Sequence, residues 1–148
     1  MRAVIQRVSE SKVIVEKKIV GEIKNGLLIL LGIKTNDSDK DVEYMIDKII
    51  NLRIFNDNDG KLNKSIQDIN GEILIVSNFT VYGDSRKGRR PSYTESAKYD
   101  IALKYYELFI KKIKETGINC QTGIFGADMK VCIENDGPIT LILDSPNN

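Results

Sequence analysis

Two segments carry small polar side chains directly after apolar, β-branched runs, and they lie far apart in the sequence. They are Ser77–Val81 (SNFTV) and Asn135–Thr140 (NDGPIT). Both are expected at or near the end of a strand, where a small enzyme can form a pocket. The chain contains no histidine, which removes the usual general base and the commonest metal ligand. Any chemistry must therefore use hydroxyls, amides, main-chain groups or the substrate itself.

Ser77 and Thr80 could serve as hydroxyl nucleophiles, but such a hydroxyl needs a base within hydrogen-bond distance. On a regular strand these two side chains would also point to opposite faces of the sheet. The backbone offers a better use of the segment, because N–H groups around Phe79 and Thr80 can stabilise an oxyanion where a strand ends or bulges. We therefore expect the main chain to act here, with a Thr80 nucleophile as the alternative.

Gly137 and Pro138 stand between a strand predicted to end at Glu134 and another predicted to begin at Ile139. A Gly-Pro pair is ordinarily only a turn. Here it lies beside the amide of Asn135, between two ordered strands, and constrained backbone in such a place favours a binding site.

A basic loop follows the first segment. It carries four basic residues: Arg86, Lys87, Arg89 and Arg90. Gly83 and Gly88 have the spacing of a phosphate-binding loop, but arginines stand where Lys and Ser or Thr are needed, which excludes a nucleoside-triphosphate site. The loop is either a solvated charged segment or a contact to RNA phosphates.

The strands that must position these segments are predicted from period-two alternation and apolar runs. Residues 1–8 and 11–17 read as the two arms of an antiparallel pair, and the run 27–31 is typical of a strand buried on both faces. Residues 71–83 form the longest regular strand pattern. Shorter strands are predicted at 18–23, 52–55, near 121, at 129–134 and at 139–143.

Two helices are predicted, one from a cap at Asp37 or Ser38 to about Asn51, and one from about Ser96 to Glu115. Residues 56–60 resemble a calcium loop only superficially, because apolar residues would occupy its first and twelfth positions, and we expect a tight turn. Strands outnumber helices and hairpin-like stretches separate the helices, which favours the α+β class over a doubly wound parallel sheet.

The composition indicates the number of domains, the kind of partner and the cellular location to expect. Its 148 residues suit one compact domain, residues 1–148. Lys plus Arg (22) nearly balance Asp plus Glu (21), so a nucleic-acid partner would need a local patch. Cys120 and Cys132 match no redox or zinc spacing and are expected to be small buried hydrophobes. With no signal peptide and no apolar run of about 18 residues, we expect a cytoplasmic protein that does not bind membranes.

Over essentially its whole length the chain resembles the bacterial-type D-aminoacyl-tRNA deacylases, also known as the D-Tyr-tRNA deacylase family. The family signature Asn-x-Gly-Pro-x-Thr is matched in full by residues 135–140, and Ser-Gln-x-Thr is matched at 77–80 except that Asn78 replaces glutamine. The other segments that carry the resemblance are Met1–Val8, Gly26–Gly32, Arg53–Phe55, Lys87–Ser92, Gln121–Gly123 and Ala127–Met129.

The resemblance implies a barrel-like, largely antiparallel sheet with two main helices packed on it, in a homodimer with its active site at the subunit interface. It implies that a cis Gly137-Pro138 peptide reaches into the partner's pocket, where its carbonyls bind the substrate ammonium and exclude an L side chain. Arg7 would orient this loop. Residues that would line the adenosine and aminoacyl region are Phe125, Ala127 and Met129.

We therefore expect a hydrolase, with neither metal nor cofactor, that cleaves the ester of D-aminoacyl-tRNA. Glycyl-tRNA, including glycine mischarged on tRNA-Ala, is an expected second substrate because glycine has no side chain to exclude. Two other readings are a non-catalytic RNA-binding module built on residues 86–90 and an amino-acid-binding regulatory domain. The sequence shows no aromatic platform for RNA bases beside the basic loop.

Overall fold

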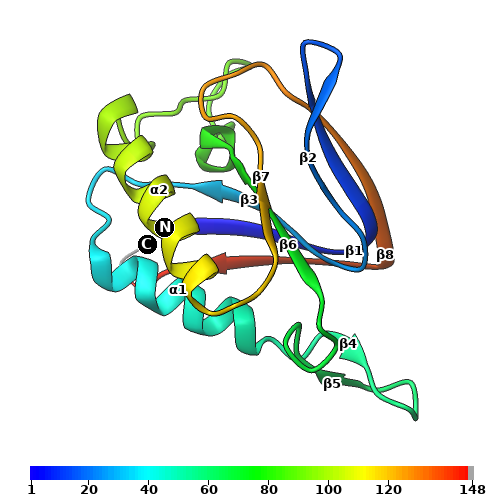
Figure 1. Cartoon of the computed structure of the whole chain (residues 1–148). Helices are drawn as coiled ribbons and strands as arrows, with labels where there is room; N and C mark the ends of the chain where they lie inside the picture. Colours follow the sequence, from blue (N-terminus) through cyan, green and yellow to red (C-terminus); the bar gives the residue numbers. More distant parts are fainter. Residues whose placement is uncertain (147–148) are drawn as a thin grey trace.

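The computed structural model describes residues 1–146, which form one curled sheet with two helices against it (Figure 1). The six strands of the sheet run in the order β2-β1-β3-β6-β7, with β8 on β1. Their bounds are β1 Arg2–Val15, β2 Lys18–Ile23, β3 Gly26–Gly32, β6 Glu72–Ser77, β7 Cys120–Thr122 and β8 Lys130–Asp144.

The sheet curls into a nearly closed barrel. Its two end strands, β2 and β7, come close enough that a Cβ built on Gly21 would lie 2.4 Å from the carbonyl oxygen of Thr122. The pairs β1–β2, β1–β3 and β1–β8 are antiparallel, whereas β3–β6 and β6–β7 are parallel. The predicted fold class, α+β with a barrel-like and largely antiparallel sheet, is confirmed.

The first strand is longer than predicted. Residues 1–8 and 11–17 do not form two paired arms; β1 runs through both, and the chain reverses at Glu16 and Lys17, whose φ angles are 47° and 66°. The first half of β1 pairs with β3, the second half with β2, and β8 follows both halves with register shifts around Val8. Because β1 bends, this one strand can pair with three others, β2, β3 and β8.

The helices α1 (Asp39–Asn51) and α2 (Tyr99–Glu115) cover one face of the sheet (Figure 1). Ser38 caps α1, as predicted: its backbone N–H and its hydroxyl both donate to Asp41 Oδ2, at 2.9 and 2.6 Å. α2 begins later than the predicted Ser96, because Ala97 N–H donates to the carbonyl of Ile33 at 2.8 Å and keeps the preceding chain extended.

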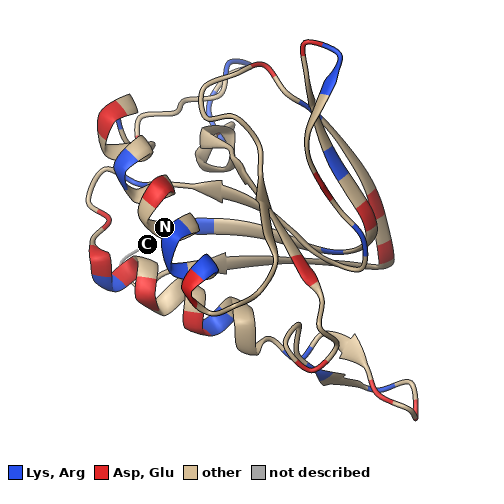
Figure 2. Ribbon diagram, in the orientation of Figure 1, with Lys and Arg blue, Asp and Glu red and all other residues tan. Residues whose placement is uncertain are grey.

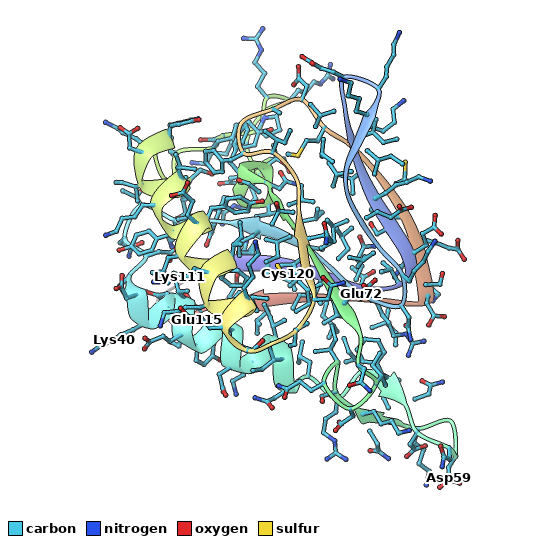
Figure 3. All side chains as sticks on the ribbon, viewed as in Figure 1. Lys40, Asp59, Glu72, Lys111, Glu115 and Cys120 are labelled. Atoms are coloured by element: carbon cyan, nitrogen blue, oxygen red, sulfur yellow. The ribbon has the colours of Figure 1, made fainter. Side chains whose placement is uncertain are left out.

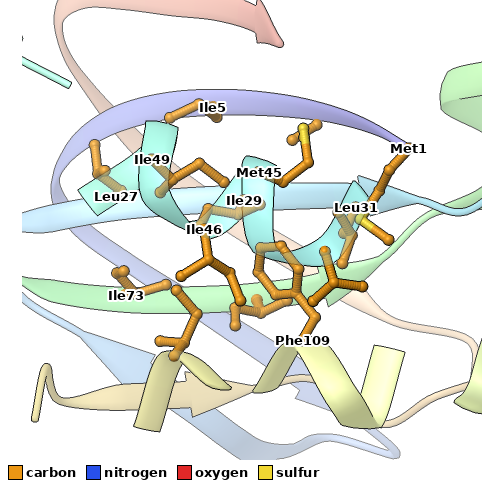
Figure 4. Close-up of a cluster of buried hydrophobic side chains, with 14 of the residues drawn as sticks. Met1, Ile5, Leu27, Ile29, Leu31, Met45, Ile46, Ile49, Ile73 and Phe109 are labelled. Carbon is orange, nitrogen blue, oxygen red and sulfur yellow. The ribbon is translucent and has the colours of Figure 1, made fainter. Parts of the chain in front are cut away.

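Two hydrophobic cores lie on the two faces of β3. Leu27, Ile29 and Leu31 face the helices and pack with side chains of α1 and α2, including Phe109 (Figure 4). Leu28 faces the barrel interior, in a smaller cluster with residues of β1 and β6 such as Val13. The prediction of a strand buried on both faces is confirmed.

A hairpin of β4 (Phe55–Asn56) and β5 (Leu62–Lys64) projects from the body, with Asp59 near its tip (Figure 3). The strand predicted at 52–55 is reduced to β4. The predicted tight turn is confirmed: Asp57 Oδ1 accepts the N–H groups of Asp59 and Lys61, both at 2.9 Å. Within residues 1–146, no group of three or more acidic or cysteine side chains is placed to hold a metal ion, and no helix there is long and apolar enough to cross a membrane.

Three predicted strands differ from the observed ones in ways that matter for the site. The strand predicted at 71–83 ends at Ser77, which pairs with Leu31 near the end of β3, and the chain then forms a short 3-10 helix, η1 (Phe79–Tyr82). The strands predicted at 129–134 and 139–143 are one strand, β8. Along it, Asn135 pairs with Val8 and Thr140 with Gln6, so the four residues 136–139 bulge out opposite a single β1 residue.

Replacing Phe109 by Ala should lower the free energy of unfolding by about 3–5 kcal/mol, because the ring is fully buried between helix and sheet. Urea denaturation measures this. The control is Leu62→Ala on the exposed hairpin, where the change should stay within about 0.5 kcal/mol. Equal effects in the two variants would contradict the assignment of the main core.

Candidate functional site

The turn after β6 is held by its own N-cap. Asn78 Oδ1 accepts the backbone N–H of Thr80 at 3.1 Å and the Thr80 hydroxyl at 2.5 Å. Asparagine is among the preferred N-cap residues, since its short side chain reaches the second N–H of a helix. The replacement of the family's glutamine by Asn78 therefore has a local structural role.

Residues outside the turn fix both of its ends. Ser96 Oγ donates to the carbonyl of Phe79 at 3.0 Å. At the other end, Arg2 donates to the carbonyl of Val81 at 3.4 Å and its guanidinium lies 5.2 Å from the centre of the Tyr82 ring. A Cβ on Gly32 would lie 2.3 Å from Val81 Cγ2, so this glycine lets η1 pack over the end of β3.

A cavity of about 840 Å³ opens beside this turn. Its walls come from the ends of β3 and β6, η1, the start of α2, the 125–129 segment and β8. Predicted site residues that line it are Ser77, Asn78, Phe79, Thr80, Phe125, Ala127 and Met129.

Ser77 and Thr80 both line this one cavity, and the regular strand that would have sent their side chains to opposite faces is not present. The expectation of opposite faces assumed a regular strand through both residues, whereas the strand ends at Ser77 and Thr80 belongs to η1. The Thr80 N–H is already bonded to Asn78. The first N–H groups of a helix have no intrahelical acceptor, and the N–H of Phe79, the first residue of η1, is one of these.

The wall opposite the turn is aromatic. The Phe125 ring makes an edge contact with Tyr99, with centroids 5.1 Å apart, and a tilted contact with Tyr106 at 5.4 Å. The Tyr106 hydroxyl donates to the carbonyl of Ile75 at 3.0 Å, and burial raises the pKa of this phenol. Tyr106 therefore supports the wall and is a poor proton donor or acceptor for chemistry.

Several cavity residues were not predicted as site residues; among the polar ones are Tyr99 and Asp128, the latter inside the Ala127–Met129 segment that carried the resemblance. Tyr99 was counted only as part of the predicted helix, and Asp128 is the one carboxylate among the cavity's lining residues. No periodicity marks either position. Only the proximity of α2 to the 125–129 segment brings them together.

The Gly137-Pro138 peptide is cis. Both residues are exposed, and neither lines the cavity of its own chain. Gly137 has φ of 122°, a value that L side chains rarely adopt. The peptide thus projects from the bulge of β8 with its main chain uncovered.

Arg7 and Asn135 hold this bulge in place. Arg7 is 7% exposed, and its Nε lies 3.0 Å from Asp136 Oδ2, while Nη1 donates to the carbonyl of Ile54 at 3.0 Å. The Asn135 amide donates to the carbonyls of Arg7 and Ile139, both at 2.9 Å, across the base of the bulge. Neither side chain lines the cavity, so the structure places both as supports of the Gly-Pro segment.

The basic loop lies at the surface, and basic and acidic side chains are mixed over the rest of the molecule (Figure 2). Arg86 is engaged by Asp84, with Nε and Nη2 each donating at 2.8 Å, and these bonds hold the pKa of Asp84 at about 2. Within residues 1–146, Lys87, Arg89 and Arg90 form no ion pair within 4 Å and are exposed. These three cations are available to an anionic partner.

The cysteines lie away from the cavity. Both are half-buried rather than buried, and only Cys120 packs against the main core. Burial raises the pKa of the Cys120 thiol to about 11, which keeps it protonated and unreactive at neutral pH.

These features coincide with a known family. A family model described as D-Tyr-tRNA(Tyr) deacylase matches residues 4–144, and the chain belongs to this family. The D-aminoacyl-tRNA deacylase of Thermosipho africanus is 61% identical over 98% of this chain and 97% of that protein, and the Clostridium tetani enzyme of the same name is 58% identical over the same shares.

Solved structures agree with the fold. One titled c-Myc DNA Unwinding Element Binding Protein has a TM-score of 0.93 and 39% identity, covering 99% of both chains. Another, titled as a probable eukaryotic D-amino acid tRNA deacylase, has a TM-score of 0.84 at 17% identity over 97% of this chain and 98% of that chain, which shows the shared fold alone.

Replacing Gly32 by Ala should reduce catalysis by about 10- to 100-fold, because the added Cβ displaces Val81 and Tyr82 and with them the turn. Steady-state deacylation measures this. Lys61→Ala is the control, since this side chain is exposed and lies on the distant hairpin (Figure 3). Full activity of the Gly32 variant would show that the position of η1 does not matter.

Proposed function

We propose that this protein hydrolyses the ester that joins a D-amino acid to the 3′ ribose of tRNA, releasing free amino acid and tRNA. Its membership in the deacylase family supports the reaction. The observation that carries the proposal is the cavity bordered by the first turn of η1, where main-chain N–H groups meet a space large enough for an aminoacyl-adenosine. An RNA substrate of translation fits a cytoplasmic location.

The Phe79 N–H is the proposed oxyanion donor. Water attacks the ester carbonyl carbon, and the oxygen that gains negative charge accepts the hydrogen bond from Phe79. The ribose 2′-hydroxyl takes a proton from the water and passes its own to the departing 3′ oxygen. This route needs no titratable protein group, metal or cofactor, as a chain without histidine requires.

Thr80 is not the nucleophile in this mechanism, because its hydroxyl already donates to Asn78. Thr80→Ala should lower kcat by no more than about tenfold, the effect of losing one hydrogen bond. A tRNA ending in 2′-deoxyadenosine should be cleaved about 100- to 10,000-fold more slowly, as for loss of a general acid–base group. Single-turnover assays measure both. Complete loss of activity in a folded Thr80→Ala variant would instead favour a Thr80 nucleophile.

Chirality is proposed to be enforced by main-chain oxygens of a second subunit. The Gly137-Pro138 peptide is exposed and lies outside its own cavity, yet the buried Arg7 and the Asn135 amide hold it rigidly. Such a segment is suited to enter the cavity of a two-fold related copy, since a two-fold contact delivers the same segment in both directions. Its carbonyls would bind the substrate ammonium and clash with an L side chain.

The surface beside the bulge favours such a dimer. Along β8 after the bulge, Leu141 (38%) and Ile142 (69%) remain exposed, whereas the exposed Ile133 before the bulge (42%) lines the cavity. Exposed apolar groups gathered on one strand mark a protein–protein contact. Because the bulge interrupts this same strand, a contact made by β8 would carry the Gly-Pro peptide to the partner.

Ile142→Asp should convert the dimer to a monomer and lower deacylation of D-Tyr-tRNA by about 100-fold, since each cavity then lacks the partner's peptide. Light scattering and the deacylation assay measure the two effects. Ile19→Asp, at a position 54% exposed on β2, is the control and should change neither. A fully active monomer would contradict the interface site.

The substrates in that assay separate the candidate functions. D-Tyr-tRNA and glycyl-tRNA, including glycine on tRNA-Ala, should be cleaved and L-Tyr-tRNA spared, because only the L side chain meets the carbonyl barrier. A non-catalytic RNA-binding module would leave all three esters intact. An amino-acid-binding domain would bind free D-tyrosine without tRNA, which calorimetry detects.

A further inference from the structure

The basic loop is closed at its base by main-chain hydrogen bonds. Asp84 and Ser92 exchange their N–H and carbonyl groups, at 2.8 and 2.9 Å. This pairing confines Arg86, Lys87, Arg89 and Arg90 to the outer end of a loop whose base adjoins η1. A change in the position of the basic residues, such as one caused by a bound phosphate, is therefore expected to shift the base of the loop beside η1.

The next residues contact the Phe79 turn directly. The Tyr93 ring meets the Phe79 ring edge-on, with centroids 5.1 Å apart and planes at 74°. A Cβ on Gly83 would lie 2.9 Å from Tyr93 Cε1, so glycine at this position permits the close approach. Ser96 then donates to the Phe79 carbonyl at 3.0 Å. Phe79 is thus held by its ring and by its carbonyl from the segment that carries the loop.

The far end of this segment is anchored to the sheet. Thr35 N–H donates to the carbonyl of Glu95 at 3.3 Å, and Ala97 N–H to that of Ile33 at 2.8 Å. The Phe79 and Tyr93 rings remain 56% and 38% exposed, so their contact adds little to the core. The main effect of the contact between Phe79 and Tyr93 is to fix the position of Phe79 relative to the basic loop.

We propose that Tyr93 and Ser96 are positioning residues that couple the docking of tRNA phosphates on the basic loop to the orientation of the Phe79 N–H. The inference rests on the proposed roles of the loop and of Phe79. Phosphate contacts at Lys87, Arg89 and Arg90 then raise kcat as well as binding, and an ester that lacks phosphates is cleaved more slowly although it fills the same cavity.

The test compares kcat and KM for two substrates, D-Tyr-tRNA and D-tyrosyl-adenosine, which has no phosphate. The ratio of kcat for D-Tyr-tRNA to kcat for D-tyrosyl-adenosine should exceed one for the unmodified protein. It should fall by about tenfold in Tyr93→Ala and in Ser96→Ala, a size expected for a small misplacement of the donor. Tyr93→Phe keeps the ring and should retain the ratio. Lys61→Gln, on the distant hairpin, is the control for surface changes.

A second set of variants measures the coupling. Lys87→Gln, Arg89→Gln and Arg90→Gln combined should raise KM and lower kcat for the tRNA only. Adding Tyr93→Ala to this triple variant should lower the kcat ratio no further, because both changes break the same connection.

The outcomes distinguish the two levels of the proposal. If Tyr93→Ala lowers kcat equally for both substrates, or adds fully to the triple variant, Tyr93 only supports the turn and the coupling is wrong, while the deacylase function stands. A triple variant with unchanged KM and kcat on tRNA would overturn the loop as a tRNA contact and the coupling with it. If the unmodified protein cleaved neither of the two esters, the function itself would be overturned.

Discussion

The pairing of β3 with β6 ends at Leu31 and Ser77, and the site depends on that ending. Asn78 N–H still donates to the carbonyl of Leu31 at 2.9 Å, but the backbone of residues 79–82 pairs with none of the described strands, and its N–H and carbonyl groups still need partners. The amide of Asn78, the hydroxyl of Ser96 and the guanidinium of Arg2 supply them. A main chain held by side chains rather than by a strand can keep one N–H directed at a cavity.

The bulge in β8 solves a similar problem in a different way. Four residues stand opposite one on β1, so their main-chain groups also lack a ladder partner. Asn135 closes the base of the bulge, and the buried Arg7 holds Asp136 beside it. The peptide at the tip is therefore held in place although both of its residues are exposed. Rigidity matters for the proposed function, because a steric barrier against one enantiomer acts only if it cannot move aside.

The proposed catalytic site, made of main-chain groups, suits a chain without histidine. The donors proposed there need no titration, and the hydroxyl of Tyr106, behind the aromatic wall, is bonded to a main-chain carbonyl and has its pKa raised by burial. Positional precision replaces acid–base chemistry in such a site. This explains why so many polar side chains of the region bond to backbone atoms of η1 and of the bulge.

The sequence by itself determined the α+β class, the doubly buried strand at 27–31, both helices and the two polar segments, because each leaves a local signature in periodicity, capping or motif. The sequence also showed the family resemblance, from which the cis Gly137-Pro138 peptide was predicted. The tertiary structure alone decided where β6 ends, that β1 and β8 are each continuous, and that Ser77 and Thr80 share a cavity with Tyr99 and Asp128. Those features depend on whether a neighbouring strand is present. That neighbour comes from a distant part of the chain, so the alternation of residues along one strand cannot predict it.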